Sequence, residues 1–275
     1  MLATLAYTPM PVAQRLARTY TWLFDKLIPR LRRVALRNLE LAGMPAACAD
    51  EVYVSLARML VSFARFPRIR RDNVAQWIQY EGFEHFEQAL SRGKGVLFAT
   101  GHLGNWELSA FSHALMASPM HVVVRPLDNP LIDGFVERYR GLSGNNILSK
   151  KDFIRPMLKA LANNEAVGIL VDQNAGLSDG VFVEFFGRKA CVNPSFAKLA
   201  ARTGATVIPG FAVWSEAAAR YVLKFYPPLE MSGDATEDTQ RIQSALERAI
   251  REHPGEWLWL HRRWKTRPAG EQEIY

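Results

Sequence analysis

Apolar residues recur every three or four positions near the amino terminus, which is the spacing of one face of a helix. The stripe consists of Leu16, Tyr20, Leu23, Leu27, Leu31 and Val34, and Pro29 predicts a kink within it. Basic side chains project from the other side, at Arg15, Arg18, Lys26 and Arg33. A helix packed on the core with a solvated basic face fits this pattern. A surface helix that lies against anionic lipid fits it equally well.

The pattern changes near residue 93. Residues 12–92 are predicted to be almost purely helical, with a second helix over 51–66 that Pro67 ends, whereas residues 93–262 alternate short β-rich runs with helical stretches. The predicted strands are 95–100, 121–125, 167–171, 181–186, 206–213 and 221–226, and the predicted helices are 105–116, 130–140, 152–162, 194–203 and 238–252. Such alternation predicts an α/β fold with a central, largely parallel sheet covered by helices. We expect one structural domain, in which residues 1–92 form a membrane-facing helical segment and residues 93–275 form the α/β core.

Composition narrows the possible partners. The chain has 275 residues, with 34 Lys and Arg against 27 Asp and Glu, a formal charge of +7. This excess favours anionic partners, namely nucleic acid, acidic lipid headgroups or an acidic carrier protein. We expect no nucleic-acid binding, because no known motif is present and the basic residues are scattered.

Cysteine content and hydropathy exclude other classes. Cys48 and Cys191 are the two cysteines, so neither a disulfide framework nor a Cys-rich zinc site is expected, and a reducing compartment is predicted. Residues 1–13 lack a basic leader and are interrupted by Pro9 and Pro11, which is untypical of a signal peptide. No run of about 18 apolar residues occurs, so a transmembrane helix is not predicted.

The strongest chemical signal is the segment Gly95–Glu107, in which a buried strand is followed by Gly101, His102, Gly104 and then a helix. Within one helix, positions five apart point about 140° away from each other, so His102 and Glu107 can meet only if His102 lies on the turn. The dipole of the helix then keeps Glu107 ionised in its first turn. A carboxylate on one imidazole nitrogen leaves the other free as a general base. The alternatives are a purely structural histidine and a metal ligand, but no further ligands have zinc-like spacing and no metal is expected.

Several segments carry a family resemblance. The His102-x-x-x-x-Glu107 box resembles that of the lysophospholipid acyltransferase superfamily, and is more closely similar to the late acyltransferases of lipid A biosynthesis, of the lauroyl and myristoyl type. Further similar segments, in the family's order, are residues 33–39, 122–130, 171–173 with 180–188, 203–209 and 257–268. Two features depart from the family: no amino-terminal transmembrane anchor is evident, and Cys191-Val-Asn193-Pro194 replaces a Thr-rich stretch.

The resemblance implies a glycerolipid acyltransferase-like fold and an enzyme without a cofactor. It implies transfer of a fatty acyl chain from an acyl thioester, on acyl-carrier protein or on acyl-CoA, to a hydroxyl of a membrane glycolipid such as a lipid A precursor. The expected location is the cytoplasmic face of the inner membrane, with peripheral attachment to an anionic surface. The alternatives are a phospholipid or mannoside-lipid acyltransferase that uses acyl-CoA, and a non-catalytic peripheral lipid-binding protein.

The resemblance and the chemistry together assign roles. We expect His102 to deprotonate the acceptor hydroxyl, Glu107 to hold the imidazole, and the hydroxyl to attack the thioester directly, because no nucleophilic Ser or Cys is evident beside the histidine. Substrate binding is expected from Arg125, Asp128, Asp172, Gln173 and Arg188. The alternatives are an Arg125–Asp128 ion pair, capping of a turn by Asp172 and Gln173, and a solvated Arg188. Residues 261–265 are expected either to bind headgroup anions or to form a structural salt-bridge cluster.

Overall fold

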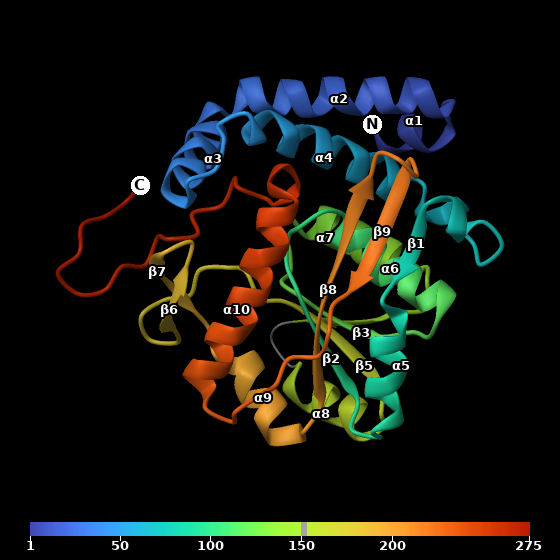
Figure 1. The fold of residues 1–275 in the computed structure, drawn as a ribbon. Helices are drawn as coiled ribbons and strands as arrows, with labels where there is room; N and C mark the ends of the chain where they lie inside the picture. Colours follow the sequence, from blue (N-terminus) through green and yellow to red (C-terminus); the bar gives the residue numbers. More distant parts are fainter. Residues whose placement is uncertain (150–152) are drawn as a thin grey trace.

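A seven-stranded sheet forms the centre of the protein in the computed structural model, which describes residues 1–149 and 153–275 (Figure 1). The strand order is β1-β9-β8-β2-β5-β3-β4. Its strands are β1 (Ile78–Glu81), β2 (Val96–Thr100), β3 (His121–Val124), β4 (Asn146–Ser149), β5 (Ala166–Leu170), β8 (Thr206–Ser215) and β9 (Arg220–Phe225). Every neighbouring pair is parallel except β8 and β9. The predicted α/β class with a largely parallel sheet is therefore confirmed.

Helices cover both faces of this sheet. On one face α5 (Phe83–Ser91) and α6 (Trp106–Met116) pack against β1, β2, β8 and β9 through a core that includes Phe86, Phe98 and Phe111. On the other face lie α8 (Ile154–Ala162), α9 (Ser195–Thr203) and α10 (Ala235–Glu252), which pack around Leu161, Phe196 and Ile242. An antiparallel hairpin of β6 (Val181–Phe185) and β7 (Arg188–Val192) packs beside α10 (Figure 1). The remaining helix of this part is α7 (Pro130–Gly141).

The sequence pattern predicted six of the nine strands in the described residues. All six predicted strands are present with ends shifted by at most a few residues, but β1, β4 and β7 were not predicted. The interpretation of residues 12–92 as almost purely helical is therefore wrong at β1, which pairs with β9 at the sheet edge. Edge strands of four residues carry too few positions for an alternation to be recognised. The helix predicted over 152–162 begins at Ile154, and Asp152 lies outside the described residues.

Four helices precede the sheet: α1 (Leu2–Tyr7), α2 (Met10–Leu27), α3 (Pro29–Ala42) and α4 (Cys48–Ala64). Figure 1 shows α2 lying along α4, above the sheet. Pro29 is the first residue of α3 and ends α2 at Ile28, so the expected kink is a complete break. Within the described ranges, no helix is both long and apolar enough to cross a bilayer.

The side of α2 that packs on α4 is not the predicted large apolar stripe. Its buried residues are Ala13, Ala17, Thr21 and Asp25, which recur every four positions. Asp25 is neutralised by Arg32 of α3, with an Nε–Oδ1 distance of 2.8 Å. Leu23 and Leu27 remain exposed, as do Trp22 and Phe24. Close packing through small residues, with Leu16 and Tyr20 half-buried beside them, thus leaves the large apolar side chains of residues 22–24 and Leu27 on the surface, which is the geometry of the surface-helix alternative.

Gly104 fixes the approach of the loop after β2 to strand β8. Its φ of +65° lies in the left-handed region, and an added Cβ would lie 1.9 Å from the carbonyl oxygen of Ala212. Gly43 has the same φ of +65° but no atom within 4 Å of such a Cβ.

Substitution of Gly43 and Gly104 can separate the cost of backbone strain from the cost of steric overlap, because the two residues share the same φ. Gly43→Ala should lower the free energy of unfolding by about 1–2 kcal/mol, the cost of a left-handed alanine. Gly104→Ala should lower it by about 3 kcal/mol or more, because displacement of β8 is added. Urea denaturation of both variants measures the difference, and equal losses would show that β8 yields without cost.

Candidate active site

The loop between β2 and α6 places His102 at the carboxyl edge of the sheet. Two backbone hydrogen bonds hold this loop: the amide of Leu258 donates to the carbonyl of His102, at 2.9 Å, and the amide of Asn105 donates to the carbonyl of Ala212, at 2.8 Å. Asn105 also caps α6, since its Oδ1 accepts from the amide of Leu108 at 3.0 Å. His102 thus lies on the glycine-flanked turn and Glu107 in the first helical turn, as the sequence predicts.

The imidazole is oriented by Asp172 at the end of β5. Nδ1 of His102 lies 2.9 Å from Oδ1 of Asp172, and the amide of His102 donates to Oδ2 at 2.7 Å. The indole Nε1 of Trp257 donates to the same Oδ2 at 2.9 Å. Asp172 has 0% of its surface exposed. The carboxylate therefore fixes Nδ1 as the protonated nitrogen and leaves Nε2 for chemistry.

Strand register explains why the two residues meet. Thr100 of β2 pairs with Leu170 of β5, and the strands are parallel. His102 and Asp172 each follow their strand by two residues, so the same register brings them side by side beyond the sheet. The position is the edge where open parallel sheets place their sites.

His102 and Asp172 shift each other's pKa values in opposite directions. Burial by itself disfavours the charged imidazole, but the charge and hydrogen bond of Asp172 outweigh it and raise the pKa of His102 above its usual value. Burial likewise disfavours the carboxylate, yet His102 holds the pKa of Asp172 far below the usual range. Asp172 is therefore ionised throughout the physiological range, and His102 binds its proton more tightly than a free imidazole.

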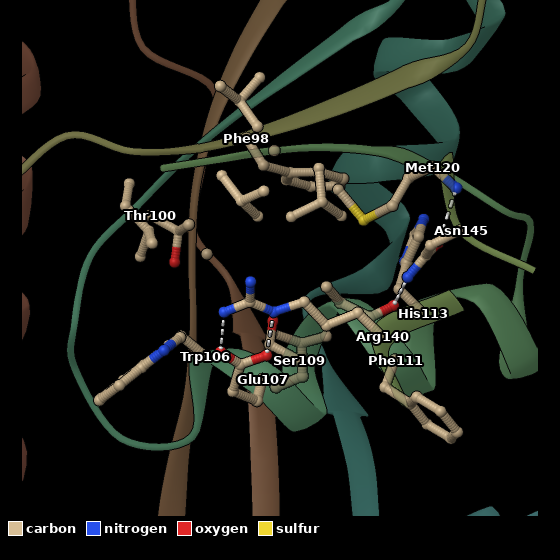
Figure 2. Close-up of a pocket in the computed structure, with 18 of the residues that line it drawn as sticks. Phe98, Thr100, Trp106, Glu107, Ser109, Phe111, His113, Met120, Arg140 and Asn145 are labelled. Atoms are coloured by element: carbon tan, nitrogen blue, oxygen red, sulfur yellow. Dashed lines mark hydrogen bonds and ion pairs between the residues drawn. The ribbon is translucent and has the colours of Figure 1, made fainter. Parts of the chain in front are cut away.

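Glu107 does not hold the imidazole, and this corrects the predicted His102–Glu107 contact. Its two carboxylate oxygens accept a bidentate pair of hydrogen bonds from Arg140 of α7, at 2.9 Å from Nε and 2.5 Å from Nη2 (Figure 2). A guanidinium offers two parallel donors that match a carboxylate. Burial lowers the pKa of Arg140, but Glu107 more than offsets this and the pKa is raised.

Two cavities meet beside His102. The first is an apolar pocket between α6 and the sheet, with the Glu107–Arg140 pair on its wall (Figure 2). Its lining includes Phe98, Phe111, Met120, Val122, Gly168, Leu223 and Phe225. The second is an open cleft of about 640 Å³ that contains His102, Arg125, Asp128, Gln173 and Ser195. Trp106 and Arg140 line both, and the Trp106 ring lies edge-on to His102 with centroids 4.9 Å apart.

Of the predicted substrate-binding residues, Arg125, Asp128 and Gln173 lie in the cleft with exposed side chains. No Arg125–Asp128 ion pair is formed among the described residues. Arg188 lines neither cavity, and its Nε donates to the carbonyl of Leu41 at 3.2 Å. Asp172 is part of the histidine pair and faces no open space, so its assignment to substrate binding is replaced.

The basic carboxyl-terminal run forms internal structure. Arg263 is fully buried and donates to the carbonyl of Cys191 at 3.2 Å and to Oε1 of Gln243 at 3.0 Å. Nδ1 of His261 lies 2.7 Å from the carbonyl of Leu258. Cys191, an alternative nucleophile, is buried, and burial raises the pKa of its thiol. Arg263 and His261 therefore have a structural role, but through hydrogen bonds to carbonyl and amide oxygens and not through the predicted salt-bridge cluster.

Sequence reasoning did not single out Arg140, Trp257 or Trp106 as site residues. The position of His102 and of Asp172 just after a predicted buried strand was a usable signal for their pairing. No comparable signal exists for Arg140, which lies 33 residues from Glu107 on a helix whose placement depends on β3 and β4.

Comparison with known proteins identifies the family. The family model of the bacterial lipid A biosynthesis acyltransferases matches residues 1–266. The chain belongs to this acyltransferase family. The lauroyltransferase of lipid A biosynthesis from Escherichia coli K12 is 31% identical, covering 97% of this chain and 90% of its own. The palmitoleoyltransferase from the same strain is 28% identical over 97% and 89%, and the myristoyltransferase is 23% identical over 100% and 87%.

Membership makes this protein an O-acyltransferase and confirms the family resemblance of its motifs. In this acyltransferase the segment from His102 to Glu107 lies between an apolar pocket and an open cleft. A base at such a junction can act on a hydroxyl in the cleft while an apolar chain occupies the pocket.

The pKa of His102 gives a testable pH dependence. A general base must be neutral, so kcat/KM should fall as pH decreases through a pKa above the usual value of about 6.5. Asp172→Asn removes the carboxylate that raises this pKa, so the acidic limb should move to lower pH. The same change frees the imidazole orientation, so kcat should fall at least about 100-fold. Asp179→Asn, at an exposed carboxylate of the same cleft, is the matched control. An unmoved acidic limb in a folded Asp172→Asn protein would refute the pairing as the cause.

Proposed function

We propose that this acyltransferase moves a fatty acyl chain from an acyl thioester to a hydroxyl of a membrane glycolipid, such as a lipid A precursor. The observation that carries the proposal is a histidine base, oriented by a buried carboxylate, at the junction of the apolar pocket and the cleft. The acyl chain occupies the pocket and the acceptor headgroup occupies the cleft. The family's lipid A transferases support this class of acceptor.

The proposed reaction is a direct transfer. Nε2 of His102 takes the proton of the acceptor hydroxyl while its oxygen attacks the thioester carbonyl carbon. The carbon–sulfur bond then breaks, and the imidazolium returns the proton to the leaving thiolate. Direct transfer requires both substrates to be bound together in the two adjoining cavities. Asp172 stabilises the imidazolium in between, since it is ionised and 2.9 Å from Nδ1.

Glu107 acts through Arg140 in this proposal. The bidentate pair keeps the guanidinium at the boundary between pocket and cleft, where the thioester carbonyl lies. A cation there stabilises the negative oxygen of the tetrahedral intermediate. Arg125, exposed in the cleft, is proposed to bind a phosphate of the acceptor together with the polar side chains of Asp128 and Gln173. Arg188 is not proposed to bind substrate, because it lines neither cavity.

Acyl-carrier protein is the proposed donor, in preference to acyl-CoA. The formal charge of +7 favours an acidic carrier electrostatically. The proposed location is the cytoplasmic face of the inner membrane, with peripheral attachment through residues 1–92. Exposed Trp22 and Leu27 of α2, beside Arg15, Arg18 and Lys26, provide the apolar and basic groups that such attachment requires.

The test of the activity uses purified protein, labelled acyl-carrier protein and a lipid A precursor dispersed in detergent. His102→Ala should reduce acyl transfer at least about 100-fold in a protein that remains folded, as judged by circular dichroism. His85→Ala, at a histidine on α5 outside both cavities, is the matched control and should retain activity. Near-normal transfer by a folded His102→Ala protein, or labelled acyl chain trapped covalently on the enzyme, would contradict direct attack by the activated hydroxyl.

Membrane attachment gives a separate prediction. Raising the salt concentration from roughly 0.1 M to 1 M shortens the Debye length from about 10 Å to about 3 Å, so binding to vesicles rich in phosphatidylglycerol should weaken. Trp22→Ser combined with Leu27→Ser should weaken it further, because both side chains are exposed, at 56% and 78%. These substitutions leave the buried α2–α4 contact intact, unlike a deletion of the helix. Co-sedimentation with vesicles measures both effects, and binding that neither change reduces would disprove attachment through α2.

A further inference from the structure

Exposed large apolar side chains fall into two groups along the chain. One belongs to the amino-terminal helices, between Met1 and Leu36. The second consists of Leu127, Leu131, Ile132, Phe135, Leu142, Ile154 and Leu177. In the described part of the chain, none occurs between residues 37 and 126, or after 177. The second group therefore requires an explanation of its own.

Several residues of the second group lie on, or next in the chain to, segments that line the cleft that contains His102. Leu127 itself lines the cleft, and it lies on the loop between β3 and α7. Phe153 and Gly176 line it too, and the chain neighbours of these two residues are the exposed Ile154 and Leu177. Three segments that are distant in sequence thus each turn an apolar side chain outward at the same opening. We call these seven residues the apolar rim.

Helix α7 contributes Leu131, Ile132 and Phe135 to the rim, and Leu142 is the residue that follows it. The helix has 12 residues, and none of them is buried. At 100° per residue, Leu131, Phe135, Arg138 and Leu142 lie within about 60° of one another. Tyr139 and Arg140 lie on the inner side, where Tyr139 stacks on Phe63 with centroids 5.4 Å apart. Leu131, the most prominent residue, is 85% exposed.

We propose that the apolar rim inserts into the lipid bilayer that holds the acceptor, as a membrane contact separate from the amino-terminal helices. This inference rests on the proposed function in one respect, that the acceptor is a membrane lipid. The acceptor's tails must stay in apolar surroundings while its hydroxyl reaches His102, and a cleft whose mouth lies in the bilayer surface meets both requirements. Insertion also removes the exposed apolar area of the rim from water.

Charge on α7 favours a bilayer over the acidic carrier protein as the occupant. Arg138 lies within the apolar stripe, where a long basic side chain can reach lipid phosphates at the membrane surface. Asp133 and Glu137 project roughly opposite to Leu131, at about 200° and 240° around the helix. Asp133 also has a partner within the protein, because its Oδ1 accepts a hydrogen bond from the amide of Leu127 at 2.8 Å.

The test measures the environment of the rim directly. Both native cysteines are buried, so a cysteine introduced at Leu131→Cys can be labelled selectively with nitrobenzoxadiazole. Its emission should rise at least about twofold and shift to the blue when vesicles of phosphatidylethanolamine and phosphatidylglycerol are added, as the probe enters apolar surroundings. Gln88→Cys is the control, since Gln88 is exposed on α5, which leads to the opposite edge of the sheet. Its label should keep the emission of a water-exposed probe.

Two results would overturn the inference. Water-like emission from the label at position 131 while the protein co-sediments with vesicles would show that the rim stays outside the bilayer. A rise in emission on adding acyl-carrier protein alone would assign the rim to the donor instead. The probe responds to membrane contact and not to chemistry, so a failure of acyl transfer with a normal emission change would refute the proposed function and leave the rim's insertion standing.

Substitution provides a second readout. Leu131→Ser combined with Ile132→Ser should lower kcat/KM about tenfold for a lipid A precursor embedded in vesicles, through loss of apolar burial. The same variant should turn over detergent-dispersed precursor at the normal rate, since neither side chain lines a cavity. Equal activity of variant and parent on vesicles would also overturn the inference.

Discussion

The carboxylate of Asp172 is fully buried, and the geometry of the site follows from the way its charge is stabilised. A buried ion without partners costs several kcal/mol. Asp172 receives hydrogen bonds from the amide and the ring of His102 and from the indole of Trp257. These donors come from the loop after β2 and from the carboxyl-terminal segment, so both must close over the end of β5. The orientation of the base and the packing of the chain end therefore depend on one charge.

A second buried ion, the guanidinium of Arg263, stabilises the carboxylate of Asp172. Gln243 of α10 donates to the carbonyl of Val171, at 2.8 Å, and accepts from Arg263. Burial lowers the pKa of Arg263 to about 10, which still leaves it charged at neutral pH, and it attracts Asp172 electrostatically. The basic carboxyl-terminal run thus stabilises the site from inside the protein. Because Arg263 is buried, its charge cannot contact a substrate.

The division of the site into pocket and cleft explains why two carboxylates near one histidine have different tasks. Asp172 is buried behind the imidazole, whereas Glu107 faces the apolar pocket and is neutralised by Arg140. An unpaired carboxylate on that wall would disfavour an acyl chain, because apolar surroundings cannot solvate it. The ion pair removes the net charge and still presents a cation at the boundary of the two cavities.

The sequence by itself determined the α/β class, the family and the position of the candidate catalytic histidine. These depend on local patterns: buried strands followed by helices, and a glycine-flanked histidine between a strand and a helix. The general position of the cleft beside His102 could be predicted in the same way, through Arg125, Asp128 and Gln173 at strand ends. The partner of the histidine was not. Glu107 is five residues away and Asp172 is 70, and sequence distance favoured the wrong one.

Tertiary structure decided which charged groups pair with each other and which apolar side chains are exposed. The register of β2 with β5 set Asp172 against His102, and the placement of α7 set Arg140 against Glu107. Packing of α2 through Ala13 and Ala17 left Leu23 and Leu27 exposed, although their periodicity is that of a buried face. The physical reason is common to these cases. A helical or strand period specifies which residues share a face, but which face is covered, and by whose side chain, depends on elements that the period does not contain.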